Sequence, residues 1–240
     1  LPEGAVDLAW LVGTIACVHI GYGARSAMAP TYLTYVIAYS SVSHMGIVML
    51  GLVAFNDAGF AGGAMQMFNH GCVTAMMFFL VGVIYDRAHH REIEGFGGLA
   101  AVTPVYAGIA TLAFFAALGL PGTSAFISEA LSFLGGFAPL SGAGPNGEVL
   151  NAAGQVLFDP RYVKLATCLS IPGILITAGY VLWTLQRVFL GPVNPKYKNL
   201  EEISTREILA LAPLAVMVIA FAAASTASMA AARRYLAPFG

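Results

Sequence analysis

The chain has 240 residues, of which 58% are hydrophobic and 10% charged, and its formal net charge is −1. Soluble domains carry roughly 25% charged residues, so this composition indicates an integral membrane protein. The small net charge gives no indication of nucleic-acid binding. The three cysteines lie within apolar segments without a C-x-x-C pair, so neither a disulfide framework nor a cysteine metal site is predicted.

Six apolar segments are long enough to cross a membrane. A helix needs about 20 apolar residues, at a rise of about 1.5 Å each, to cross about 30 Å of hydrocarbon. The predicted spans are approximately residues 6–28, 32–55, 63–85, 103–137, 160–190 and 206–232. The sequence therefore predicts an all-α, polytopic membrane helix bundle that forms a single domain over residues 1–240.

The fourth and fifth segments are too long for one straight crossing, and the fourth contains a run that stops a helix and restarts it. This run is Gly119-Leu120-Pro121-Gly122-Thr123-Ser124. A helix broken at membrane depth survives only where protein or water satisfies the freed backbone groups, and in transporters such breaks commonly lie at the ion or substrate site. Gly119, Pro121 and Gly122 are therefore a candidate broken-helix site. The alternative is a kink that serves helix packing alone.

Glu129 follows this run and is the one charged residue expected deep inside a span. An ionised carboxylate is costly in hydrocarbon, so a chain that keeps one there usually uses it to carry a proton, bind an ion or pair with a partner. Burial raises the pKa of such a carboxylate and a neighbouring cation lowers it, so the balance can allow the group to take up and release a proton. Glu129 is therefore the first candidate functional residue.

Two histidines are expected at the same depth as this carboxylate. Counting about 1.5 Å per residue, His44, His70 and Glu129 lie about 18, about 19 and about 17–18 Å from the cytoplasmic ends of their spans. Imidazole titrates near neutrality and has two nitrogens on opposite edges, so three such groups at one level predict a proton relay. Polar residues that could hold waters between them are Ser40, Ser41, Ser43, Asn69 and Thr74. For each histidine alone, the alternative is helix packing with a bond to a carbonyl.

Other polar features are given structural interpretations. His19 on the first span is expected to pack or to line the interior. The run Asp86-Arg87-Ala88-His89-His90-Arg91-Glu92 contains ligand-type residues but falls in a loop, where a solvated, ion-paired loop is favoured over metal binding. The sequence shows no nucleophile–base motif, flavin fingerprint or haem ligand pair, so we expect no covalent or redox chemistry, cofactor or metal in this chain.

The basic residues predict an orientation, because six spans place alternate loops on opposite sides. One side would hold Arg25, Arg87, Arg91, Arg187, Lys196, Lys198 and Arg206, and the other Arg161, Lys164, Arg233 and Arg234. The excess of basic residues predicts that the first side is cytoplasmic. Both ends of this segment would then lie on the outer side.

Several motifs occur in an informative order. They are Ile37-Ala38-Tyr39-Ser40-Ser41-Val42-Ser43-His44-Met45-Gly46, Gln66 to Gly71, Tyr85-Asp86-Arg87, the run from Gly119 to Glu129, and Leu182 to Gly191. Together they resemble the antiporter-like subunits of respiratory complex I, the proton-pumping NADH:quinone oxidoreductase. The glutamate in the fourth motif resembles the M-type branch (mitochondrial subunit 4 equivalent), since the sister subunits carry lysine there. The likeness is specific over about residues 36–137 and weakest beyond 191.

The resemblance implies a fold of about fourteen helices with two inverted repeats, each containing one broken helix. This chain would be the C-terminal portion, the last six helices with the outlet half of a proton channel. Glu129 would be the terminal proton-exchanging carboxylate, and His44 and His70 would be relay residues. NADH, flavin, iron–sulfur clusters and quinone would belong to partner subunits, and antiporter-like neighbours would adjoin this chain in a bacterial inner membrane.

Two departures from the family pattern leave alternatives open. The resembling subunits usually carry a basic pair where this chain has Tyr32-Leu33-Thr34-Tyr35, and their upstream buried glutamate and two lysines would lie before residue 1. The alternatives are a subunit of a multisubunit cation/proton antiporter or membrane hydrogenase complex, or an inactive truncated paralogue. Tyr85-Asp86-Arg87 and the helix end at 183–191 favour complex I.

Overall fold

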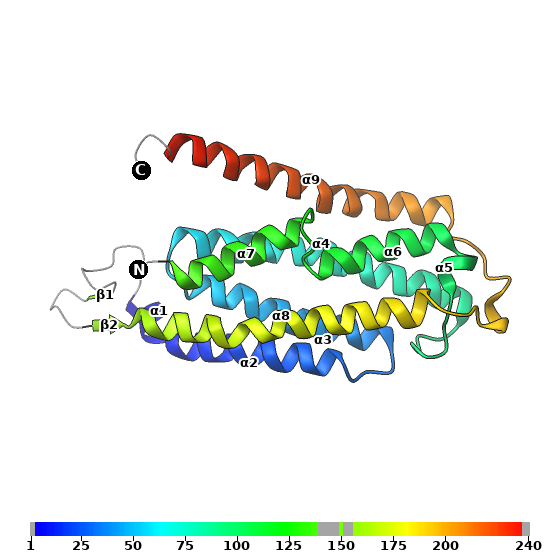
Figure 1. Cartoon of the computed structure of the whole chain (residues 1–240), viewed down its shortest axis with the longest axis horizontal. Helices are drawn as coiled ribbons and strands as arrows, with labels where there is room; N and C mark the ends of the chain where they lie inside the picture. The colour runs from blue at the N-terminus through cyan, green and yellow to red at the C-terminus, as the bar shows by residue number, and fades with distance from the viewer. Residues whose placement is uncertain (1–2, 139–148, 151–155, 237–240) are drawn as a thin grey trace. The chain divides into compact units, whose positions relative to one another are not determined.

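The computed structural model describes residues 3–138, 149–150 and 156–236, and most of them are helical (Figure 1). The elements are α1 (Glu3–Asp7), α2 (Ala9–Ala27), α3 (Leu33–Leu52), α4 (Asp57–Ala88), α5 (Leu99–Val102), α6 (Pro104–Ala117), α7 (Ser124–Phe137), β1 (Val149–Leu150), β2 (Val156–Phe158), α8 (Pro160–Phe189), the 3-10 helix η1 (Pro195–Tyr197) and α9 (Thr205–Leu236). The predicted all-α bundle with one broken helix is confirmed. One small addition is that β1 and β2 pair antiparallel, with Val149 opposite Phe158.

Two helices differ from the predicted spans in informative ways. Helix α4 begins at Asp57, six residues before the predicted span, and includes the glycines at 59, 62 and 63. A Cβ on Gly62 would lie 2.4 Å from the backbone nitrogen of Ser132, so the glycine permits a close helix contact that offsets its low helix propensity. Helix α8 continues without a break through Pro172, although the length of its segment predicts more than one straight crossing.

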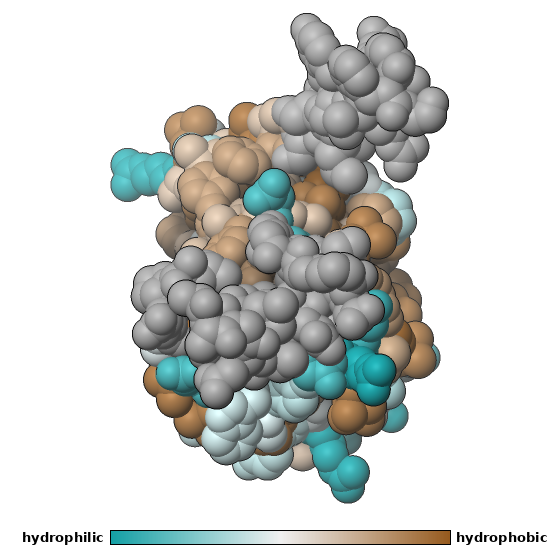
Figure 2. Space-filling model, turned by 90° about the vertical axis from the view of Figure 1, so that its left-hand side faces the viewer, coloured by the Kyte–Doolittle hydropathy of each residue, from teal (hydrophilic) through white to brown (hydrophobic). Residues whose placement is uncertain are grey.

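The described helices include several that suit a membrane. Four stretches are long and apolar enough to cross one, namely Leu33–Leu52, Asp57–Ala88, Arg161–Phe189 and Thr205–Ala224. Helices α6 and α7 are shorter apolar helices of 14 residues each. Large apolar side chains are exposed on α8 and α9, and apolar residues (brown) also reach the surface in the end view of Figure 2. These features are those of a multi-pass membrane protein.

The chain divides into two compact units. The first comprises Leu1–Pro30, Tyr35–Phe68 and Ser128–Tyr180, and the second comprises Thr31–Thr34, Asn69–Ile127 and Val181–Gly240. The single membrane domain over residues 1–240 stays a prediction. Each unit has its own packing.

Small residues bring the helices of the first unit close together around Ile20. A Cβ on Gly46 of α3 would lie 2.7 Å from Cγ1 of Ile20, and one on Gly173 of α8 would lie 2.3 Å from its Cγ2. Without aqueous solvent between them, membrane helices gain most of their association energy from such close packing. The buried cluster at this position consists of Ala16, Ile20, Ile47, Leu50 and Ala166.

In the second unit, Arg87 joins the end of α4 to the start of α9. Its guanidinium group forms two hydrogen bonds to the Glu207 carboxylate, at 2.7 and 3.0 Å. It also donates to the carbonyl oxygens of Glu201 and Glu202, at 3.0 and 3.1 Å. A forked, charged contact of this kind is both stronger and more directional than a single neutral hydrogen bond.

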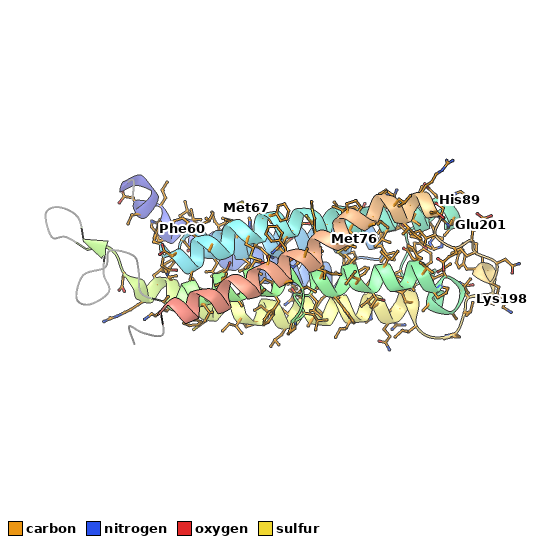
Figure 3. All side chains as sticks on the ribbon, turned by 90° about the horizontal axis from the view of Figure 1, so that it is seen from above. Phe60, Met67, Met76, His89, Lys198 and Glu201 are labelled. Atoms are coloured by element: carbon orange, nitrogen blue, oxygen red, sulfur yellow. The ribbon has the colours of Figure 1, made fainter. Side chains whose placement is uncertain are left out.

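Glu202 continues this network to the start of α6. Its carboxylate accepts hydrogen bonds from the backbone N–H groups of Val105 and Tyr106, at 2.9 and 3.0 Å. Those groups have no partner within α6, and the helix dipole favours a negative charge at this end. In Figure 3, the loop residues His89 and Glu201 lie at this same end of the unit.

Candidate functional site

The break in the fourth predicted span lies between α6 and α7. Helix α6 ends at Ala117 and α7 begins at Ser124, in agreement with the predicted break near residues 119–124. Gly119 has φ +70° and Gly122 has φ +103°, both in a region that favours glycine. Pro121, which lies between them, cannot donate a backbone hydrogen bond. Two glycines with positive φ and a proline without a backbone N–H thus interrupt the helix.

Several polar groups at the break have partners within the second unit. The Leu120 N–H donates to the carbonyl of Phe115 at 3.2 Å, and the Thr123 hydroxyl donates to the carbonyl of Leu120 at 2.8 Å. The Asn69 side chain donates to the carbonyl of Ser124 at 3.0 Å. Such satisfaction is the condition for a broken helix at membrane depth.

Glu129 and His44 meet in the first unit. Glu129 lies in the second turn of α7 and is 9% exposed, while His44 lies in α3 and is 4% exposed. The distance between His44 Nε2 and Glu129 Oε1 is 3.6 Å. The structure therefore brings together two of the three predicted relay residues, which are 85 positions apart in the sequence.

Two further polar residues surround the carboxylate. Gln66 of α4 donates from Nε2 to Glu129 Oε1 at 3.3 Å, and the Ser128 hydroxyl donates to Gln66 Oε1. Both side chains are buried. Both residues lie within the sequence motifs, yet the sequence alone predicted no role for either of them. The available signal was the presence of an amide in an apolar run, four residues before His70.

The two ring nitrogens of His44 have different surroundings. Nδ1 lies 2.7 Å from the carbonyl oxygen of Ser40. Because a carbonyl can only accept, Nδ1 carries the hydrogen, and in the neutral ring Nε2 presents a lone pair. That lone pair faces Glu129. Nε2 is therefore the nitrogen that can exchange a proton in this arrangement.

His70 lies in α4 and is half-buried. Its backbone carbonyl accepts a hydrogen bond from the hydroxyl of Thr74. Gln66 and His70 are four residues apart in one helix, a spacing that places side chains on the same face. The part of His70 in a relay with Glu129 stays a prediction.

The hydroxyl groups of the serines near His44 donate hydrogen bonds to backbone carbonyls. Ser40 and Ser41 both donate to Ile37, at 2.8 and 3.1 Å, and Ser43 donates to Ile20 of α2 at 3.1 Å. Their oxygen lone pairs can still accept a hydrogen bond from water. If these serines hold waters, as predicted, they do so by accepting hydrogen bonds through their hydroxyl oxygens.

The loop after α4 is held by its own contacts. The His90 ring stacks on Phe96, with centroids 4.4 Å apart, and its Nε2 contacts the hydroxyl of Tyr197. Burial and then the nearby Lys196 lower the pKa of His90, against a raising effect of Glu92. Within the described part of the chain, no group of three or more His, Cys, Asp or Glu side chains is placed to hold a metal ion.

The Glu129–His44 arrangement can hold and move a proton. At 3.6 Å the two atoms are beyond the usual 2.7–3.2 Å of a hydrogen bond, so direct transfer needs an approach of roughly 0.5 Å. In the neutral state, a protonated Glu129 can donate to Nε2. After transfer, an imidazolium faces a carboxylate, and the Gln66 donor supports the charge.

Comparison with known proteins identifies the family. A family profile described as "NADH:quinone oxidoreductase/Mrp antiporter, TM" matches residues 4–141, more than half of the chain. The chain belongs to this family. It is 33% identical to NADH-quinone oxidoreductase subunit M of Rickettsia bellii over 222 residues, which cover 92% of this chain and 40% of that protein.

Solved structures share the fold of this chain. The fold matches a chain of respiratory complex I from Thermus thermophilus with a TM-score of 0.77 and 26% identity, over 92% of this chain and 42% of that one. It also matches a chain of the Mrp complex from Dietzia, with a TM-score of 0.69, 18% identity, and coverage of 98% and 46%. The chain thus spans about 40% of the length of the relatives it matches.

Proposed function

We propose that this chain is part of a membrane subunit that translocates protons in an NADH:quinone oxidoreductase of the complex I type. The observation that carries the proposal is the buried contact between His44 of α3 and Glu129 of α7, the helix that follows the break. Each group can gain and lose a proton, and such groups at membrane depth are typical of proton relays. The similarity to subunit M supports the same function.

In the proposed step, one proton moves between the two groups. The O–H bond at Glu129 Oε1 breaks as an N–H bond forms at His44 Nε2, while Nδ1 keeps its hydrogen on the Ser40 carbonyl. The reactant state is neutral and the product state is an ion pair. A charge that arrives nearby therefore shifts the proton between them, because charges interact strongly in a medium of low polarity.

The surroundings of Glu129 favour a proton over a sodium ion as the transported species. A sodium ion needs several oxygen ligands, as hard cations do. Glu129 Oε1 instead faces the amide nitrogen of Gln66 and a ring nitrogen of His44. An amide donor and a ring nitrogen that can accept a proton suit a carboxyl group that changes protonation.

The proposal includes a location and partners. His70 would continue the path, and the chain would lie in a bacterial inner membrane with both ends of this segment on the outer side. Antiporter-like subunits would be its neighbours. NADH, flavin, iron–sulfur clusters and quinone would be held by other subunits, and this chain would carry no redox chemistry of its own.

Glu129→Gln tests this function in the respiratory membrane complex that contains the chain. Glutamine keeps the size and polarity but cannot exchange a proton, so we expect fewer protons pumped per electron while electron transfer persists. Glu94→Gln, at an exposed loop carboxylate, is the matched control and should pump normally. Normal pumping by Glu129→Gln would remove the role assigned to this residue.

A second candidate is a subunit of a multisubunit cation/proton antiporter or a membrane hydrogenase complex. The observation in its favour is the family itself, which covers NADH:quinone oxidoreductases and Mrp antiporters alike. Co-purification distinguishes the two, since NADH- or quinone-linked redox subunits support the first function, hydrogenase subunits support the hydrogenase complex, and small hydrophobic subunits without cofactors support the antiporter. A chain that pumps in neither setting would be an inactive paralogue.

A further inference from the structure

Tyr180 of α8 has a buried hydroxyl group that the proton path described so far does not use. The residue is 2% exposed, and among the described protein atoms its hydroxyl has no hydrogen-bond partner. Buried polar groups in native proteins are nearly always paired, so an exception calls for a role such as binding a water or taking part in the chemistry. Tyr180 belongs to the same unit as Glu129 and His44.

The neighbours of this hydroxyl are acceptors. It lies beside the side chains of Ser40 and Thr177 without a hydrogen bond of normal geometry to either. Ser40 donates its hydrogen to Ile37 at 2.8 Å, and Thr177 donates its own to Gly173 at 3.0 Å. Both oxygens therefore keep lone pairs, and the Tyr180 hydroxyl is positioned to serve as a donor to them or to a water that they hold.

The same group is connected to the Glu129–His44 pair. The Ser40 carbonyl oxygen lies 2.7 Å from Nδ1 of His44, and the Ser40 side chain lies beside the Tyr180 hydroxyl. The phenol also lies within electrostatic reach of the Glu129 carboxylate. A hydroxyl in this place can connect the carboxylate to the polar groups of α8.

We propose that Tyr180 is a further relay residue, whose hydroxyl exchanges protons with Glu129 through a water held by Ser40 and Thr177. As the hydroxyl passes its hydrogen to this water and the water passes one to the Glu129 carboxylate, the phenol oxygen accepts a hydrogen from a second water, so the phenol stays neutral. One O–H bond breaks for each that forms. This inference rests on the proposed function of Glu129 as a proton carrier.

Tyr162 provides a matched comparison on the same helix. Its hydroxyl is used structurally: it donates to the carbonyl of Trp10 at 2.5 Å and lies 2.6 Å from the Thr14 hydroxyl oxygen. Tyr162→Phe and Tyr180→Phe each remove a single oxygen from α8. Loss of the Tyr162 hydroxyl should weaken the contact of α2 with α8 and leave proton transfer intact.

The test compares Tyr180→Phe, Tyr162→Phe and Glu129→Gln in the same membrane complex. The measurements are protons pumped per electron, the pH profile of pumping, and its rate in H2O and D2O. We expect Tyr180→Phe to slow proton transfer about tenfold, which corresponds to about 1.4 kcal/mol in the barrier, and to change the pH profile and isotope effect. Tyr162→Phe should lower thermal stability without these changes.

The outcomes separate the inference from the proposed function. Impaired pumping in Glu129→Gln with normal pumping, pH profile and isotope effect in Tyr180→Phe would overturn the role of Tyr180 and leave that of Glu129 standing. Normal pumping in Glu129→Gln would overturn both. If Tyr180→Phe changes only thermal stability, as Tyr162→Phe is expected to do, its hydroxyl is structural and the inference is wrong.

Discussion

His44 combines an orienting contact with an exchanging one. Nδ1 is held by the Ser40 carbonyl at 2.7 Å, which fixes the plane of the ring, and Nε2 faces the Glu129 carboxylate. The hydrogen bond at one nitrogen decides which form the other presents. The ring is therefore already oriented for proton exchange with the Glu129 carboxyl group.

His44→Asn tests this division. The asparagine amide can take over the bond to the Ser40 carbonyl but cannot reach Glu129 or titrate, so we expect pumping per electron to fall while stability changes by at most about 1 kcal/mol. Pumping assays and thermal unfolding of the complex check both points. His19→Asn on α2 is the control and should pump normally. Retained pumping in His44→Asn would show that the ring is a packing residue.

Depth within a helix is predictable from the sequence at the residue scale, and rotation about the helix axis is not. A rise of about 1.5 Å per residue is enough to place His44 and Glu129 at one level. The count says nothing about which face each side chain occupies. The sequence therefore predicted no role for Gln66, Ser128 or Tyr180. Their roles depend on contacts between helices that are distant in the sequence.

At the scale of elements, the break before α7 depends on glycine conformations. We expect Gly122→Ala to destabilise the protein by about 1–2 kcal/mol, since its φ of +103° strains any residue with a Cβ. No atom within 4 Å would obstruct that Cβ, so the cost is conformational rather than steric. Gly108→Ala, inside α6 and equally unobstructed, should stabilise by about 0.5–1 kcal/mol. Thermal unfolding measures both, and equal effects would contradict this account of the break.

The contact of Arg87 with Glu207 gives a prediction for the ends of α4 and α9. Lysine would keep the charge but lose the forked pair of hydrogen bonds, so we expect Arg87→Lys to lower stability by about 1–2 kcal/mol. Arg206→Lys, at the exposed neighbour of Glu207, should have little effect. Unfolding of the purified complex measures the difference. An unchanged stability in Arg87→Lys would mean that the fork contributes nothing.

The sequence predicted the break and most helices because glycine, proline and apolar runs act locally. It could not predict the partners of Arg87, since Glu207 lies 120 residues further along the chain. The early start of α4 at Asp57 depends partly on contacts of the same kind. Its glycines are typical of a loop, but Gly62 packs closely against Ser132 in the helix. A local contact adds to this, since Asn56 Oδ1 accepts a hydrogen bond from the Gly59 N–H at the helix start.

At the scale of the whole molecule, the proposed proton path would include groups outside this chain. It matches about 40% of the length of its relatives, so the charge that drives the Glu129 proton would come from groups outside this segment. The chain itself contains a buried acid, Glu129, and a buried base, His44. The Ser40 carbonyl fixes the His44 ring, and Gln66 donates a hydrogen bond to the carboxylate. Such a pair responds to a distant charge because it is buried, away from the screening of bulk water.

The most direct test of this account is the protonation of Glu129 during turnover. Infrared difference spectroscopy of the complex resolves the carbonyl stretch of a protonated carboxylic acid. We predict a carboxylic acid band that changes as the complex turns over and is missing in Glu129→Gln but present in Glu94→Gln. A band that is unaffected by Glu129→Gln, or a Glu129 band that stays constant during turnover, would contradict the claim that this residue carries the proton.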